Sequence, residues 1–186
     1  MNTLKYFSLV FFILMGCQYT TKTENKYYET GELKQKITKD SANCYTFIEY
    51  YKNGNKKLEG KICNENKVGK WKEWYTDGKL KWEGHFDKNR RTINYDKQNP
   101  TISIYGSPVH IYQDTSYLIR INMFGVHPED MIVTSNNGII QICKNRDKYD
   151  FVITPKKIGE LKLVIYVMKD QKMYKIGEKC LIVNNK

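Results

Sequence analysis

Short runs of β-branched and aromatic residues, separated by turn residues, occupy most of the chain and predict an all-β fold. Three segments in the first half resemble one another: YYETGELK from Tyr27, YYKNGNKKLEGKI from Tyr50 and WYTDGKLKWEGHF from Trp74. Their turn glycines, Gly31, Gly54 and Gly78, are 23 and then 24 residues apart. Residues 27–88 therefore form an internal repeat.

Each repeat is predicted to be a β-hairpin. Asn53-Gly54 and Asp77-Gly78 are strong signals for two-residue type I′ turns, whereas Thr30-Gly31 is a weaker one. With these loops, Phe47 faces Gly60 across the first pair of strands and Trp71 faces Gly84 across the next. We expect each ring to cover the glycine opposite it, which restores the packing that glycine lacks. The opposite face would carry the pairs Tyr27–Lys34, Tyr50–Lys57 and Trp74–Lys81, with Ile37 at the glycine position of the first hairpin.

The same register places Cys44 directly opposite Cys63, at a separation that suits a disulfide. The alternative is a pair of reduced, half-buried thiols, since a longer turn would shift the register. Cys143 and Cys180 lie on expected strands of the second half and are further disulfide candidates. Whether they meet does not follow from the sequence.

The pattern Y-Y-x-x-G, followed by E-G and by G-x-W-x-x-[WY]-Y, resembles the MORN-type repeats whose bacterial members are labelled antitoxin-like or YwqK-like. The resemblance covers residues 27–86 and implies an elongated antiparallel sheet used for binding or scaffolding. Six repeat aromatics either form a recognition surface for a partner or a glycan, or pack the sheet itself. They are Tyr50, Tyr51, Trp71, Trp74, Tyr75 and Trp82.

Residues 89–100 are polar, end in Asn99-Pro100 and read as a linker. Beyond them, short strand-like runs over residues 101–186 predict an immunoglobulin-like β-sandwich. This half contains the stretch from Ile119 to Thr134 and the later Asn137-Gly138, Tyr149-x-Phe-x-Ile-x-Pro and Gly159. In these segments it is similar to the periplasmic C-terminal β-domains of GldM, a gliding-motility and type IX secretion protein. That resemblance implies a domain that contacts envelope proteins. It does not carry over energy transduction, because this chain has one such domain and no motor segment.

The N-terminus resembles a bacterial lipoprotein signal. Lys5 precedes an apolar run that is shorter than the roughly 20 residues of a spanning helix, and the run ends in Leu-Met-Gly-Cys. We expect cleavage of residues 1–16, lipid attachment at Cys17 and a polar tether over residues 17–26. No acidic cluster follows Cys17, which favours a lipoprotein that faces the periplasm. We expect the outer membrane, although the choice between inner and outer membrane does not follow from the sequence.

The net charge of +11 would suggest a nucleic-acid partner. An exported protein seldom meets nucleic acid, however, and the basic residues are interspersed with acidic ones along the chain. His85, His110 and His127 have no second ligand at metal-binding spacing, and Glu129-Asp130 is a turn pair rather than an acid–base pair. The sequence therefore predicts no enzyme, no metal or other cofactor, and no small-molecule substrate. We assign surface or packing roles to the histidines.

The functional expectation is a membrane-anchored, non-catalytic envelope lipoprotein that acts as a protein-binding or scaffold module, in its most specific form an accessory of type IX secretion or gliding. An immunity or antitoxin-type lipoprotein that neutralises a toxin is one alternative. A module that binds peptidoglycan or another anionic envelope polymer is the other.

Overall fold

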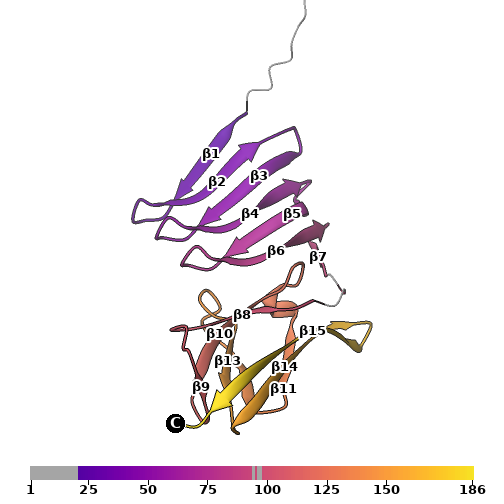
Figure 1. Cartoon of the computed structure of the whole chain (residues 1–186). Coiled ribbons are helices and arrows are strands. Elements are labelled where there is room, and N and C mark those ends of the chain that lie inside the picture. Colours follow the sequence, from indigo (N-terminus) through magenta and orange to yellow (C-terminus); the bar gives the residue numbers. More distant parts are fainter. Residues whose placement is uncertain (1–20, 94, 96–97) are drawn as a thin grey trace, which may run out of the picture.

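The structure, a computed structural model, describes residues 21–93, 95 and 98–186 and is all-β. A seven-stranded sheet is followed by two four-stranded sheets, and the only helical element among these residues is the short 3₁₀ turn η1 (Pro128–Asp130). The expected all-β fold, with a hairpin sheet followed by a sandwich, is confirmed (Figure 1). Within the described part of the chain, no helix is long and apolar enough to cross a membrane.

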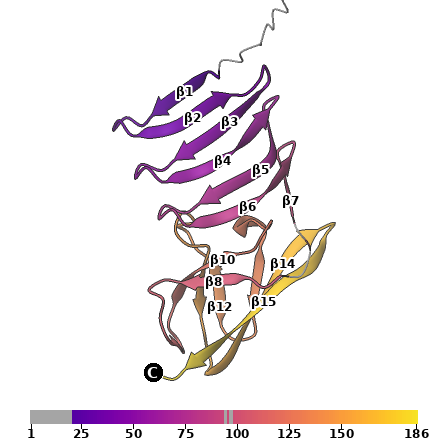
Figure 2. The ribbon, with the colours of Figure 1, turned by 45° about the horizontal axis from the view of Figure 1, so that its top comes forward.

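The repeat sheet has its strands in chain order, each antiparallel to the next. Its strands are β1 (Thr23–Tyr27), β2 (Leu33–Lys39), β3 (Cys44–Tyr50), β4 (Lys56–Cys63), β5 (Asn66–Trp74), β6 (Leu80–Asp87) and β7 (Arg90–Thr92). At about 4.8 Å between neighbours, seven strands extend the sheet by roughly 29 Å from β1 to β7. Figures 1 and 2 show that β1 lies farthest from the sandwich and that β6 lies against it.

The hairpin loops differ from the expectation. Phe47 pairs with Gly60 and Trp71 with Gly84 as predicted. The three aromatic–lysine pairs are wrong by one residue, since Tyr27 pairs with Leu33, Tyr50 with Lys56 and Trp74 with Leu80. Each loop is a turn of three residues that ends in a glycine with positive φ. A bulge then restores the register. The two-residue pattern with positive φ at both positions occurs instead at Asn64-Glu65, which joins the second repeat to the third, and at Lys88-Asn89, which joins β6 to β7.

The strand glycines are covered by rings other than those expected. A Cβ on Gly60 would meet the ring of Trp71, on the neighbouring strand β5, and not Phe47. A Cβ on Gly84 would meet the ring of Trp82, two residues earlier on the same strand, and not Trp71. The principle of a ring over a glycine therefore holds, but the ring over Gly60 comes from the next strand of the sheet and the ring over Gly84 from the same strand.

Two boundaries also change. Strand β1 begins at Thr23, so the last residues of the predicted tether pair with β2 as part of the sheet. Strand β7 lies inside the predicted linker and pairs with β6 through Phe86 and Arg91. Hydrogen bonding along the existing edge strands extends the sheet in both directions beyond the repeated motif.

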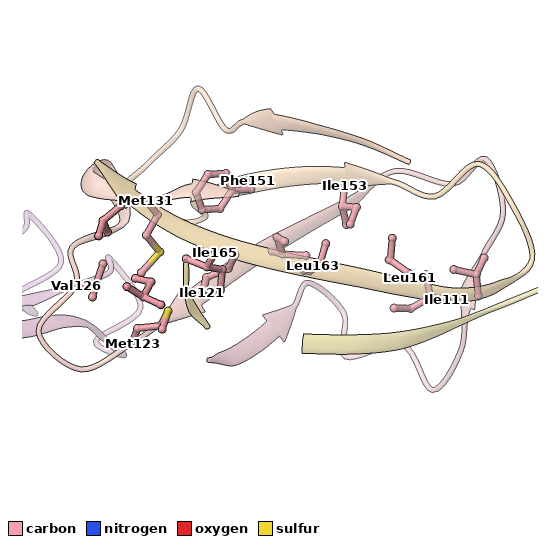
Figure 3. Close-up of a cluster of buried hydrophobic side chains, with 14 residues drawn as sticks. Ile111, Ile121, Met123, Val126, Met131, Phe151, Ile153, Leu161, Leu163 and Ile165 are labelled. Atoms are coloured by element: carbon pink, nitrogen blue, oxygen red, sulfur yellow. The ribbon is translucent and has the colours of Figure 1, made fainter. Parts of the chain in front are cut away.

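The second half is a sandwich of two four-stranded sheets, with strand orders β12-β13-β10-β8 and β11-β14-β15-β9. The strands are β8 (Thr101–Ile104), β9 (Ile111–Tyr112), β10 (Tyr117–Asn122), β11 (Ile132–Ser135), β12 (Ile139–Ile142), β13 (Phe151–Thr154), β14 (Gly159–Lys169) and β15 (Lys172–Asn184). Inward aliphatic side chains from both sheets form the core, which runs from Val126, Met123 and Met131 at one end to Leu161 and Ile111 at the other (Figure 3).

Gly177 lies inside the long strand β15. A Cβ at this position would lie 2.7 Å from the backbone oxygen of Gln98, and the backbone N–H of Gln98 donates to the carbonyl of Ile176. The glycine therefore makes room for the linker, which packs against the sandwich on its way to β8.

Candidate functional site

The six repeat aromatics do not form one exposed surface. Trp71, Tyr75 and Trp82 are at most 2% exposed, and Tyr51 is 9% exposed. Tyr50 and Trp74 are half-buried on the opposite face of the sheet. Of the two interpretations of these residues, packing of the sheet is the one that the structure supports for the four buried rings.

The second aromatic of each repeat motif forms a ladder along the sheet. The hydroxyl of Tyr28 donates to the carbonyl of Tyr50, and that of Tyr51 donates to the carbonyl of Trp74, both at 2.8 Å. In each of the three repeats a lysine from the returning strand lies over the tyrosine ring, at 5.5 to 5.8 Å from its centre. These lysines are Lys34, Lys57 and Lys81.

The last tyrosine of the ladder leaves the sheet and enters the sandwich. The hydroxyl of Tyr75 donates to Oδ2 of Asp150 at 2.5 Å, and the same oxygen accepts the backbone N–H of Ile121 at 3.0 Å. Burial raises the pKa of the Asp150 carboxyl, and burial together with the neighbouring Asp150 charge raises the pKa of the Tyr75 hydroxyl. Tyr75 thus fixes the sandwich to the end of the repeat sheet.

A second buried contact, the Glu73 cluster (Glu73, Lys81 and His127), crosses the same boundary. Glu73 accepts from Lys81 Nζ at 2.8 Å and lies 2.7 Å from Nε2 of His127, a residue of the sandwich. The side chains of Lys81 and His127 are only 5% and 3% exposed. Burial alone would raise the pKa of Glu73, but the hydrogen bonds and charges of His127 and Lys81 lower it to about 2.

Two arginines complete the boundary. Arg120 of β10 pairs with Asp77 at 2.7 Å and stacks over the Tyr75 ring at 4.1 Å. Arg91 of β7 donates two hydrogen bonds to Asp130 in η1. Together with Tyr75–Asp150 and the Glu73 cluster, these contacts form what we call the joint, which fixes the orientation of the sandwich relative to the sheet.

One face of the repeat sheet, the aromatic face, is defined by Ile37, Phe47, Leu58, Trp71 and Phe86 together with Trp82 at its sandwich end. Except for the joint at that end, no described element is stacked on this face (Figures 1 and 2). Its side chains from β2 to β4 are half-buried by one another rather than by a second layer. The opposite face carries cross-strand ion pairs, including Lys70 and Lys72 with Glu83.

The cysteines divide into three cases. Cys44 and Cys63 pair directly across β3 and β4 and form a disulfide, as predicted. Cys143 is a buried free thiol next to β12 and Cys180 is an exposed free thiol on β15, in the other sheet of the sandwich, so the candidate second disulfide is absent from the described chain. Cys17, the predicted site of lipid attachment, lies outside the described residues.

Of the three histidines, His85 and His110 are exposed, whereas His127 is buried in the joint. The carboxylate of Asp130 accepts two hydrogen bonds from Arg91. Over residues 21–93, 95 and 98–186, no group of three or more His, Cys, Asp or Glu side chains is arranged to hold a metal ion.

Sequence reasoning missed the joint, although part of its signal was readable. Glu49 and Glu73 are 24 residues apart, as are Lys57 and Lys81, so each of these two repeats places the same acid beside the same base. The partner from the sandwich, 54 residues beyond Glu73, has no local signal.

In comparisons with known proteins, no protein-family model, no curated protein and no solved structure matches this chain. The resemblances to MORN-type repeats and to the GldM β-domains therefore stay predictions from the sequence.

Proposed function

We propose that this chain is an exported lipoprotein, anchored through Cys17 in the outer membrane and facing the periplasm, that binds another envelope protein on the aromatic face of its repeat sheet. The observation that carries the proposal is that this face bears a row of apolar side chains across the strands and has no second layer, whereas such a row is ordinarily covered by another element. The most specific form of the proposal is an accessory role in type IX secretion or gliding.

Two further features support this proposal. The Cys44–Cys63 disulfide is typical of a chain that folds in an oxidising compartment outside the cytoplasm. The joint makes the sheet and the sandwich one unit, with β1 next to the N-terminal segment and the sandwich roughly 29 Å away. A partner bound on the aromatic face would thus be held at a set position between the membrane anchor and the sandwich.

The test is crosslinking in intact cells followed by affinity purification. We expect the wild type to recover an envelope protein, with secretion or gliding components supporting the specific form, and Cys17→Ser to lose it because the chain is no longer held at the membrane. Phe47→Ser on the aromatic face should also lose the partner, whereas Ile48→Ser, its neighbour on the opposite face of β3, should retain it.

Three results would contradict the proposal: no partner, recovery that is indifferent to Phe47→Ser and Cys17→Ser, or capture of an anionic polymer in place of a protein. Recovery of a single toxin-like protein would instead support the immunity alternative.

A further inference from the structure

A small hollow of about 140 Å³ lies where the aromatic face meets the joint. Trp82 and Phe86 line it, together with three cationic side chains, Lys57, Lys67 and Arg91. These cations come from three different strands, β4, β5 and β7, which the register of the sheet brings to one side. We call this hollow the Lys67 pocket.

Two of the three cations are already paired. Lys57 lies 3.4 Å from the carboxylate of Glu49, and Arg91 is held by Asp130 and Glu129. Lys67 differs, because no carboxylate of the described residues lies within 4.0 Å of its Nζ. The pocket therefore has a cation whose charge the surrounding described side chains do not pair.

Aromatic rings hold that cation in place. Nζ of Lys67 lies 4.5 Å from the ring centre of Trp71 and 5.1 Å from that of Phe86. Burial lowers the pKa of the Lys67 ammonium, because the nearby charges of Glu73 and Glu49, which raise it, are opposed by that of Arg91 and do not offset the desolvation. Ring faces compensate a desolvated ammonium less completely than a carboxylate does, and an anion that enters the pocket is therefore favoured.

The one carboxylate that lines the pocket is already occupied. Glu73 is held by Lys81 and His127 in the joint, and its low pKa reflects those contacts. Pairing with Lys67 would require Glu73 to give up these partners. A carboxylate supplied by another molecule would pair with Lys67 and leave these contacts of the joint in place.

We propose that the Lys67 pocket binds the carboxylate of an acidic side chain on the protein that docks on the aromatic face. This inference rests on the proposed function and names the chemistry of its partner. A volume of about 140 Å³ equals the liquid volume of roughly four or five waters, which is enough for a carboxylate with one or two methylenes. The adjoining surface is apolar, so the docking segment carries its acidic residue beside apolar or aromatic ones.

The test uses the full-length lipidated chain in phospholipid nanodiscs, with empty nanodiscs as background. The probes are a fluorescein-labelled peptide that alternates glutamate with tyrosine and the same peptide with glutamine. We expect the glutamate peptide to bind with an affinity that falls as salt rises, and the glutamine peptide to bind at least about tenfold more weakly.

Lys67→Gln should weaken binding of the glutamate peptide at least about tenfold, and Lys67→Arg, which keeps the charge, should retain affinity within about threefold. The matched control is Lys70→Gln, three residues along β5 on the opposite face, which should leave binding unchanged. Equal affinity for both peptides, or equal affinity of wild type and Lys67→Gln, would overturn the inference. Displacement of the peptide by inorganic phosphate at the concentration of the peptide itself would overturn it as well, because the ligand would then be a free anion.

The crosslinking experiment in cells separates this inference from the proposed function. If the wild type recovers no partner, the proposed function fails whatever the peptide does. If the wild type and Lys67→Gln recover the same partner equally well, the proposed function stands and the assignment of the Lys67 pocket fails.

Discussion

Replacing Glu73 by glutamine tests whether the joint stabilises the protein through an ionised carboxylate. In the folded chain the contacts with His127 and Lys81 lower the pKa of Glu73 from its ordinary 4.5 to about 2. At about 1.4 kcal/mol per pH unit, this difference corresponds to about 3 kcal/mol of folding free energy at neutral pH. Because the folded-state pKa is lowered, the contribution is complete above pH 4.5 and is lost as pH falls toward 2.

The repeat provides a matched control for this experiment. Glu49 occupies the equivalent position one repeat earlier, but its partner Lys57 is 39% exposed and no histidine faces it. Glu49→Gln should therefore cost only about 0–1 kcal/mol, as is usual for exposed ion pairs.

The assay is urea unfolding of the wild type and both variants between pH 2 and pH 7. We expect the gap between wild type and Glu73→Gln to be about 3 kcal/mol at pH 7 and to close toward pH 2. A cost no greater than that of Glu49→Gln, or a gap that does not change with pH, would refute the reasoning.

Three further changes test the described contacts. Replacing Cys44 and Cys63 by serine should lower the free energy of unfolding by about 3 kcal/mol, because the disulfide spans 19 residues. A reducing agent should lower the unfolding free energy of the wild type to that of the serine variant, and a remaining difference between the two proteins would contradict this contribution of the disulfide. Gly60→Ala places a Cβ against the Trp71 ring and should cost about 1–3 kcal/mol with a shift in tryptophan emission; an unchanged melting temperature would contradict this packing. Burial raises the pKa of Asp150 above its ordinary 3.8. The unfolding free energy of the wild type should therefore fall relative to that of Asp150→Asn as pH rises through the raised pKa. A difference between the two unfolding free energies that stays constant from pH 3 to 8 would contradict the burial.

The register of the hairpins was predictable because side chains alternate with a period of two and the repeat supplies several checks on the same alignment. Cys44 opposite Cys63 and Phe47 opposite Gly60 both follow from it. The loops were wrong because an Asn-Gly pair suits a type I′ turn and also a three-residue loop whose last glycine has positive φ. The bulge that compensates for the longer loop has no separate sequence signal.

The joint was beyond sequence reasoning for a different physical reason. Tyr75 and Asp150 are 75 residues apart, and their contact depends on how two domains pack, which neither period nor turn chemistry specifies. The strong burial of Trp71 and Trp82 was likewise hidden, because an exposed recognition surface and a packed sheet require the same aromatic residues at the same spacing.

The tyrosine ladder allows the number of strands in the repeat sheet to change without a change in the joint. Asp150 accepts from Tyr75 in the role that a backbone carbonyl of the following repeat plays for Tyr28 and Tyr51. A duplicated repeat could thus be inserted before Tyr75 with the contacts at both ends of the array preserved. Each such unit adds two strands, about 10 Å, to the distance between β1 and the sandwich. Variation in repeat number would thus change the reach of the sheet while leaving the first hairpin and the joint as they are.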